Sequence, residues 1–175
     1  LAAEGYASLR VAAVAKSAGV SLGGQLHHFP SKEELVVAVL ERLSRRIIEV
    51  VRRDAETDSQ GTDILALIAG SAERYYSTPE FLIFLDIFLS TRRDTLVGDA
   101  AIRLSLRDRA AIEELWKPHL TDRGLAPERS VTVIRALWGL ARGLAISSSS
   151  DRVQANQETN QLVIDALRSA EMPRQ

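Results

Sequence analysis

Apolar residues in this chain recur every three or four positions, and this helical period constrains the fold more than any other feature. The longest example is one broad stripe of aliphatic residues, formed by Leu35, Val39, Leu43, Ile47, Val50 and Val51. We find no convincing run of the period-2 alternation that a half-buried strand requires. The period therefore predicts an all-α fold.

Glycines, prolines and polar joints divide the periodic stretches into helices. After an opening stretch, Leu1–Glu4, which we expect to be the tail of a helix stopped by Gly5, a helix is predicted from Ser8 or Arg10 to Ala18. Further helices are predicted over 21–29, 31–53, 62–76, 79–91, 94–117, 127–147 and 153–171. Prolines 30, 79, 118, 127 and 173 are each assigned to positions between periodic stretches.

Composition narrows the class of protein. The chain has 175 residues, 46% hydrophobic and 26% charged, which is ordinary for a globular protein. It contains no cysteine, which excludes disulfides and thiolate chemistry. No window approaches the roughly 18 apolar residues of a membrane span, so we expect a soluble, cytoplasmic protein without a membrane partner.

Charge is unevenly distributed along the chain. Residues 1–53 carry eight Lys or Arg against five Glu, whereas the remainder carries fourteen against eighteen acidic residues. The N-terminal part is therefore where an anionic partner would be attracted.

Residues 10–30 have the pattern of a helix-turn-helix: a helix, a tight turn with glycine, and a short helix. Ala15 allows close approach of the two helices, Gly19 ends the first, and Ser21 caps the second. A recognition helix meets DNA with its N-terminal residues, so Gly23 and Gly24 are interpreted as clearance for a large ligand. The alternative is a glycine-weakened connector between packed helices.

The next segment, SKEE, is a capping box. The Ser31 hydroxyl and the Glu34 side chain are expected to satisfy each other's free backbone N–H groups at the start of the long helix.

The run AAVAKSAGVSLGGQLHHFPSKEELVVAVLE resembles the DNA-binding domain of the TetR family of bacterial transcriptional regulators. The match covers about Glu4 to Glu41 and includes Gly5–Tyr6, Val14–Ser21 and HHFPSKEEL. The resemblance implies a helix-turn-helix domain over 1–45, whose first helix lies mostly before Leu1. It also implies a helical ligand-binding and dimerisation domain over 46–175.

The resemblance also implies a set of DNA-binding residues. Arg10 stands near the start of the second helix, where a backbone phosphate is usually held, His27 stands on the phosphate-facing side of the recognition helix, and Lys32 stands at the N-terminus of the next helix. The complete set is Arg10, Ser21, Leu22, Gly23, Gly24, Gln25, Leu26, His27 and Lys32. Lys32 could instead be a solvated lysine in a capped first turn.

Gln25 and Leu26 depart from the family pattern, which has an aliphatic residue followed by tyrosine. Leu26 has no hydroxyl to donate to phosphate. Gln25 either reaches a base edge, since its amide can bond adenine bidentately, or is a buried and locally satisfied glutamine.

The adjacent histidines His27 and His28 raise the question of a metal. Neighbouring helical residues point about 100° apart, so they cannot chelate one ion well. No metal and no cofactor are expected, and His28 is expected to pack against Phe29 and the long helix.

Most aromatic residues lie beyond residue 70, and Phe81, Phe84 and Phe88 share one helical stripe. Such a stripe is either core or, as the resemblance implies, the wall of a mostly apolar effector site. Three polar side chains, those of His119, Arg107 and Arg142, could orient a ligand. Positions on the protein surface would explain the two arginines equally well. The candidate ligand-binding set is Tyr75, Phe81, Phe84, Phe88, Arg107, Trp116, His119, Trp138 and Arg142.

The two final helices are the candidates for a homodimer interface. Gly139 and Gly143 are one turn apart, which would let a neighbouring backbone approach, and the family pairs these helices between two chains. The alternative is an intramolecular core. The candidate interface is Ile134, Leu137, Gly139, Leu140, Gly143, Leu144, Leu162, Val163 and Leu167.

The sequence thus predicts a ligand-responsive, dimeric regulator that binds a palindromic double-stranded DNA operator, most simply as a repressor released by a small effector. One alternative is a helical interaction module without DNA binding. An enzyme is disfavoured because no nucleophile, paired acids or metal cluster assembles, and a catalytic His119 would need to lie in a cleft beside a carboxylate.

Overall fold

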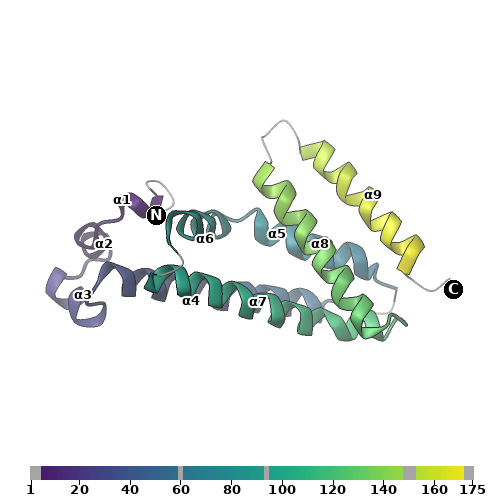
Figure 1. The fold of residues 1–175 in the computed structure, drawn as a ribbon, viewed down its shortest axis with the longest axis horizontal. Helices are drawn as coiled ribbons and strands as arrows, with labels where there is room; N and C mark the ends of the chain where they lie inside the picture. The colour runs from purple at the N-terminus through teal and green to yellow at the C-terminus, as the bar shows by residue number, and fades with distance from the viewer. Residues whose placement is uncertain (1–4, 59–60, 93–94, 148–152, 172–175) are drawn as a thin grey trace. The chain divides into compact units, whose positions relative to one another are not determined.

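The computed structural model describes residues 5–58, 61–92, 95–147 and 153–171, and the regular structure within these stretches is helical (Figure 1). The helices are α1 (Gly5–Ser8), α2 (Val11–Ser17), α3 (Leu22–His28), α4 (Lys32–Glu56), α5 (Ile64–Tyr76), α6 (Pro79–Ser90), α7 (Leu96–Thr121), α8 (Pro127–Ser147) and α9 (Val153–Glu171). The all-α prediction is confirmed.

Side-chain caps set the starts of several helices, as predicted for the hydroxyl groups of Ser21 and Ser31. The Ser21 hydroxyl accepts from the Gly24 N–H at 3.0 Å, and the Ser31 hydroxyl accepts from the Glu34 N–H at 3.1 Å. Asp63 caps α5 by accepting from the Ala66 N–H. These bonds satisfy backbone donors that have no partner inside the helix.

The prediction that every proline lies between helical stretches is only partly correct. Pro79 and Pro127 are the first residues of α6 and α8, where a missing N–H costs nothing. Pro118 lies inside α7, which continues to Thr121 instead of ending at 117. Pro173 and the predicted helix tail Leu1–Glu4 lie outside the described residues, and Gly5, with φ +74, is the first residue of α1.

The chain divides into two compact units, and the first is discontinuous in sequence. Unit 1 is residues 1–47 and 79–108, and unit 2 is residues 48–78 and 109–175. This division differs from the contiguous one predicted at 45/46, because α6 and the first half of α7 pack with the N-terminal helices.

The core of unit 1 is formed by α4, α6 and α7. Its buried residues are Val36, Leu40, Ile87, Val97, Ala100, Ala101 and Leu104. Tyr6 and Leu9 pack against this cluster from the N-terminal side. The short helix α1 and the following Leu9 are therefore supported by residues of α6 and α7 that follow them by about 80 to 100 positions in the sequence.

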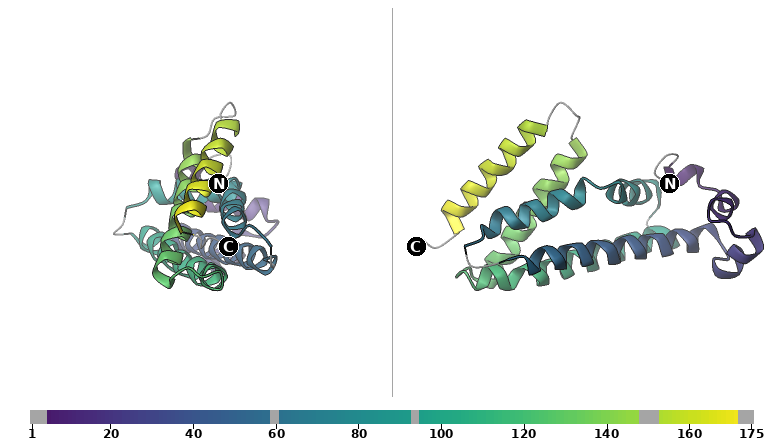
Figure 2. Two further views of the ribbon diagram at one scale, coloured as in Figure 1. Left: turned by 90° about the vertical axis from the view of Figure 1, so that its right-hand side faces the viewer. Right: turned by 180° about the vertical axis from the view of Figure 1, so that it is seen from behind.

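Unit 2 is built around α5 and α8, which pack extensively against each other. α5 buries Leu65 and Ile68, and α8 buries Ile134 and Leu137. α9 lies beside α8 and also contacts α5 (Figure 2).

Candidate nucleic-acid interface

The turn between α2 and α3 has the geometry that the sequence predicts. Gly19 has φ +69, in the left-handed region that favours glycine. The Val20 N–H donates to the Ala15 carbonyl at 3.0 Å, and Ala15 is buried. Ser21 then caps α3, so α2, the turn and α3 form a helix-turn-helix.

All residues of α3 except Gln25 are exposed. Gly23 and His27 lie one turn apart, on the side of the helix opposite Gln25. Leu22 and Leu26 are also one turn apart and are 45% and 40% exposed. His28 is exposed as well, with its ring edge-on to that of His27, so the prediction that it packs against Phe29 and the long helix is wrong.

Gln25 is 6% exposed, and neither its amide oxygen nor its amide nitrogen has a hydrogen-bond partner in the described chain. Burial keeps the side chain away from any base edge, which argues against the first interpretation of this residue. The second interpretation, a buried and locally satisfied glutamine, is correct for the burial. It is wrong for the hydrogen bonds, because the amide has no partner in the described chain. Sequence alone could not show this, because the register of α3 against α2 decides which side chain points inward.

The two glycines of α3 have different surroundings. A Cβ added at Gly23 would meet no heavy atom within 4 Å, whereas one at Gly24 would lie 3.1 Å from the Ser21 hydroxyl oxygen. Gly23 therefore leaves open space on the outward side of the helix, and Gly24 lies beside the cap.

Two exposed cationic side chains lie on α2, the helix that packs against α3. Arg10 is the exposed N-cap residue of α2, Lys16 is exposed in the last turn of α2, and residues 5–32 contain no Asp or Glu. A polyanion would therefore meet no carboxylate from this segment.

Lys32 is not a solvated lysine. Its Nζ donates to the Tyr6 carbonyl at 3.0 Å and lies 4.6 Å from the centre of the Tyr6 ring. The Tyr6 N–H donates to Asp86 Oδ2 at 2.6 Å. Lys32 of α4 and Asp86 of α6 thus hold the short helix α1 in place.

The candidate ligand-binding residues are divided between the two units. Phe81, Phe84, Phe88 and Arg107 belong to unit 1, and Tyr75, Trp116, His119, Trp138 and Arg142 belong to unit 2. Phe81 is buried, Phe84 packs against the core of unit 1 and stacks on Phe88, and Phe88 is 37% exposed. The phenylalanine stripe thus belongs largely to the core of unit 1.

Arg107 is engaged with its neighbours in unit 1. Its guanidinium donates to the Ser44 hydroxyl, which in turn donates to Asp108 at 2.5 Å. Burial raises the pKa of the Asp108 carboxyl above its ordinary value, and hydrogen bonds from Ser44 and Arg107 only partly oppose this effect.

In unit 2 an aromatic cluster joins α5 and α8. The ring of Trp138 lies 6.2 Å from that of Tyr75 and 5.7 Å from that of Tyr76. Burial raises the pKa of the Tyr76 hydroxyl, and the charges of Arg142 and Arg109 oppose the rise. Tyr76 was missing from the candidate set, although it is adjacent to Tyr75.

Trp116 and Trp138 both bury an indole N–H without a hydrogen-bond acceptor in the described chain. Buried indole N–H groups usually have a partner. These two groups are donors that a bound acceptor could satisfy.

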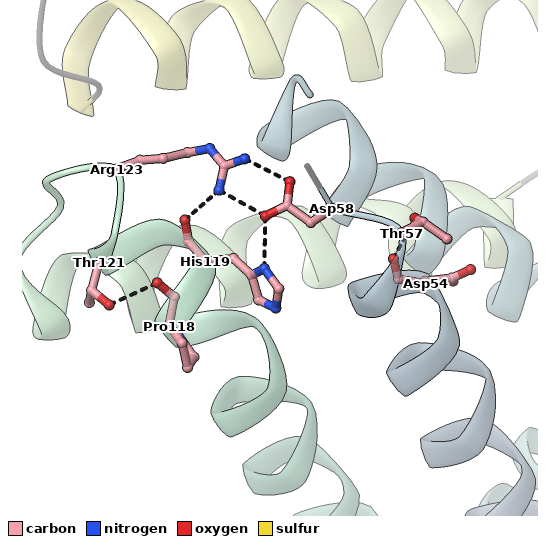
Figure 3. A network of polar contacts seen from close by, with 7 residues as sticks. All are labelled: Asp54, Thr57, Asp58, Pro118, His119, Thr121 and Arg123. Carbon is pink, nitrogen blue, oxygen red and sulfur yellow. Dashed lines mark hydrogen bonds and ion pairs between the residues drawn. The ribbon is translucent and has the colours of Figure 1, made fainter. Parts of the chain in front are cut away.

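His119 is engaged in an ion-pair network at the end of α7 (Figure 3). Its Nδ1 lies 2.8 Å from Asp58 Oδ2, and Arg123 binds both oxygens of Asp58 at 2.6 and 2.8 Å. Burial raises the pKa of Asp58, but the hydrogen bonds and charges of Arg123 and His119 outweigh it, so this pKa lies below its ordinary value.

Arg123 also donates to the His119 carbonyl and so stabilises the last turn of α7, after Pro118. His119 does lie beside a carboxylate, as a catalytic histidine would need. However, Arg123 already occupies that carboxylate, and the three groups together link the residues after α4 to the end of α7.

The candidate dimer-interface residues of α8 lie on two sides of that helix. Ile134 and Leu137 are buried within the protomer at 1% and 0% exposure, so their assignment to a dimer interface is wrong. They lie on the face that packs against α5. On the other side, Gly143 is exposed and Gly139 is partly exposed, with no heavy atom within 4 Å of an added Cβ at either position.

The remaining candidate residues have some exposure. Leu162 of α9 is 70% exposed, and Leu140, Leu144, Val163 and Leu167 are partly exposed.

Across the described ranges, no group of three or more His, Asp or Glu side chains could hold a metal ion. In the same ranges, every helix is too short or too polar to cross a bilayer.

Comparison with known proteins identifies the class. The family model for bacterial regulatory proteins of the tetR family matches residues 1–39. The HTH-type transcriptional regulator CymR of Pseudomonas putida is 32% identical over 145 residues, which is 83% of this chain and 71% of that protein. The chain therefore belongs to the TetR family of transcriptional regulators.

Solved structures share the fold. A transcriptional regulator from Aquifex aeolicus VF5 aligns with a TM-score of 0.67 and 19% identity, over 97% of this chain and 91% of that one. A TetR transcriptional regulator from Legionella pneumophila aligns with a TM-score of 0.63 and 19% identity, over 93% and 88% of the two chains.

Proposed function

We propose that the chain is a dimeric repressor that binds a palindromic DNA operator through α3 and is released by a small, mostly apolar effector. The observation that carries the DNA-binding part is the helix-turn-helix itself. It presents α3 with six of its seven residues exposed, in a segment with cations and no carboxylate. A protein that acts on bacterial DNA would work in the cytoplasm.

A dimer supplies what one short helix lacks. α3 alone offers few contacts to bases, and two-fold symmetry would double them over half-sites about 34–36 Å apart. The small outward residues of α8, Gly139 and Gly143, favour close approach of a second copy through α8 and α9.

The effector would bind in unit 2, near the aromatic cluster of Tyr75, Tyr76 and Trp138. The unsatisfied indole donors of Trp116 and Trp138 favour a ligand that is largely apolar but carries a hydrogen-bond acceptor. Release from DNA requires the effector to bind the DNA-competent conformation less tightly than the other one.

A selection experiment tests DNA binding. Duplexes enriched from a random-sequence library should contain an inverted repeat. Their affinity should fall steeply with salt, by about 10³–10⁵ between 50 and 200 mM for six to ten phosphate contacts. A helical interaction module without DNA binding would enrich no sequence and show no such salt dependence.

A thermal-shift screen of small aromatic and aliphatic compounds tests the effector. A true effector should raise the melting temperature, quench tryptophan fluorescence and weaken binding to the selected duplex. We propose no catalytic activity, and the relatives reported above are transcriptional regulators.

A further inference from the structure

The outward surface of α3 is poor in groups that read bases by hydrogen bonding. Gln25 is its only amide side chain, and it is buried. Gly23 and Gly24 have no side chain, and α3 contains no arginine, lysine, asparagine or acid. Only the two histidines and the capping Ser21 carry polar side-chain atoms on this surface.

Leu22 and Leu26 are the two large apolar side chains exposed on α3, between the buried Gln25 and the outward Gly23. They are 45% and 40% exposed, and as residues i and i+4 they lie about 5–6 Å apart on one face of the helix. Gly23 lies beside them and leaves open space out to 4 Å. The glycine therefore lets the backbone approach a surface closely enough for both leucines to touch it.

One base in duplex DNA offers an apolar group to such side chains. Thymine carries a C5-methyl group in the major groove, and apolar side chains make contact with it. Bases on one strand are spaced by about 3.4 Å along the axis. Two leucines 5–6 Å apart therefore fit methyl groups separated by one or two base steps.

Charge favours DNA over an apolar protein partner for this surface. Residues 5–32 carry Arg10, Lys16 and Lys32 together with His27 and His28, and no carboxylate. A polyanion is attracted by the exposed Arg10 and Lys16, whereas an uncharged apolar peptide would gain nothing from them.

We propose that Leu22 and Leu26 determine operator specificity by contact with thymine methyl groups in each half-site. This inference rests on the proposed function and adds the chemistry by which the operator is read. It assigns sequence discrimination to apolar contact, and it leaves Gln25 as a buried residue of the helix-turn-helix.

The test uses the duplex enriched by selection, with deoxyuridine replacing thymidine at one position at a time. Deoxyuridine pairs like thymidine and lacks only the C5-methyl group. Loss of one buried methyl group should weaken binding by about fourfold, and by about fifteenfold when both half-sites are exchanged. The effect should be confined to one or two positions per half-site.

Two variants connect the effect to the leucines. In Leu22→Ala and Leu26→Ala, binding to the thymidine duplex should weaken, and each variant should lose most of the deoxyuridine effect at one position. Both side chains are partly exposed, so the fold should survive, which a thermal melt checks. Leu106→Ala is the matched control, because Leu106 is 58% exposed on α7, and it should keep the full deoxyuridine effect.

Equal binding of thymidine and deoxyuridine duplexes would overturn the inference and leave DNA binding intact. A deoxyuridine effect that persists unchanged in both leucine variants would overturn it as well. If no duplex is enriched at all, the proposed function fails, and the inference fails with it.

Discussion

Gly23 occupies the outward side of α3, one turn before His27, and its role can be separated from stability. An added Cβ would meet no heavy atom within 4 Å. Gly23→Ala should therefore stabilise the helix by about 0.5–1 kcal/mol, because alanine loses less backbone entropy on folding. The same methyl group would occupy the space through which the helix approaches a groove.

We therefore expect Gly23→Ala to raise the melting temperature slightly and to weaken binding to the selected duplex by tenfold or more. Thermal melts and fluorescence anisotropy measure the two effects on the same samples. Unchanged DNA affinity would support the connector interpretation of the glycine pair.

The carboxyl groups of Asp58 and Asp108 have pKa values shifted in opposite directions. The pKa of Asp58 is lowered by Arg123 and His119, so its charge stabilises the fold above the ordinary carboxyl pKa of about 3.9. The pKa of Asp108 is raised by burial, so its charge weakens the fold over the same range.

At pH 7, Asp58→Asn should lower the melting temperature, whereas Asp108→Asn should leave it unchanged or raise it. An asparagine at 108 can still accept from the Ser44 hydroxyl. Below about pH 4 the deficit of Asp58→Asn should close, because the native carboxyl is itself protonated as the pH falls through its lowered pKa. Equal losses in both variants at pH 7 would contradict this assignment.

Helix α3 has only seven residues and depends on its cap. Ser21→Ala should cost about 1 kcal/mol and weaken DNA binding by loosening the helix. Ser21→Asn should restore both properties, because asparagine caps equally well.

Ser21→Asp separates the cap from the charge. Aspartate also caps a helix, so the melting temperature should be kept. Its negative charge beside a phosphate backbone should nevertheless weaken DNA binding, and more so at low salt. A DNA affinity equal to that of the wild type would indicate that the start of α3 lies away from the phosphates.

The sequence predicted the elements better than their contacts, for a physical reason. Caps and turns at Gly19, Ser21 and Ser31 depend on bonds between residues one turn apart, so a local pattern specifies them. The partner of Lys32 is 26 residues away, and the burial of Gln25 depends on how α3 packs on α2. Such non-local relations leave little trace in a short stretch of sequence.

The ligand candidates illustrate the same limit. Phe81, Phe84 and Phe88 have a clear helical period, but a period cannot say which core a stripe joins. They lie in unit 1, while Trp116 and Trp138 lie in unit 2. The family and its helix-turn-helix were nevertheless recognisable, because their motif is local.

The proposed dimer predicts the effect of a charge placed on the outward side of α8. Gly143→Glu should leave the protomer folded, because Gly143 is exposed and an added Cβ meets nothing within 4 Å. Two like charges at a symmetric interface should dissociate the dimer. Sedimentation should then show a monomer, and affinity for a palindromic duplex should approach that for one half-site.

Ala110→Glu on α7 is the matched control, since it adds the same charge at an exposed position. It should sediment like the wild-type protein. A Gly143→Glu variant that remains dimeric would place the interface elsewhere.

The discontinuity of unit 1 matters for any attempt to transfer this helix-turn-helix unit to another ligand-binding domain. A fragment that stops at residue 47 would leave Val36 and Leu40 without Ile87, Ala101 and Leu104, and Tyr6 without Asp86. A working chimaera would have to bring residues 79–108 along with the first 47. Swapping specificity in this protein therefore means exchanging two pieces of chain at once, or else only the side chains on the surface of a single short helix.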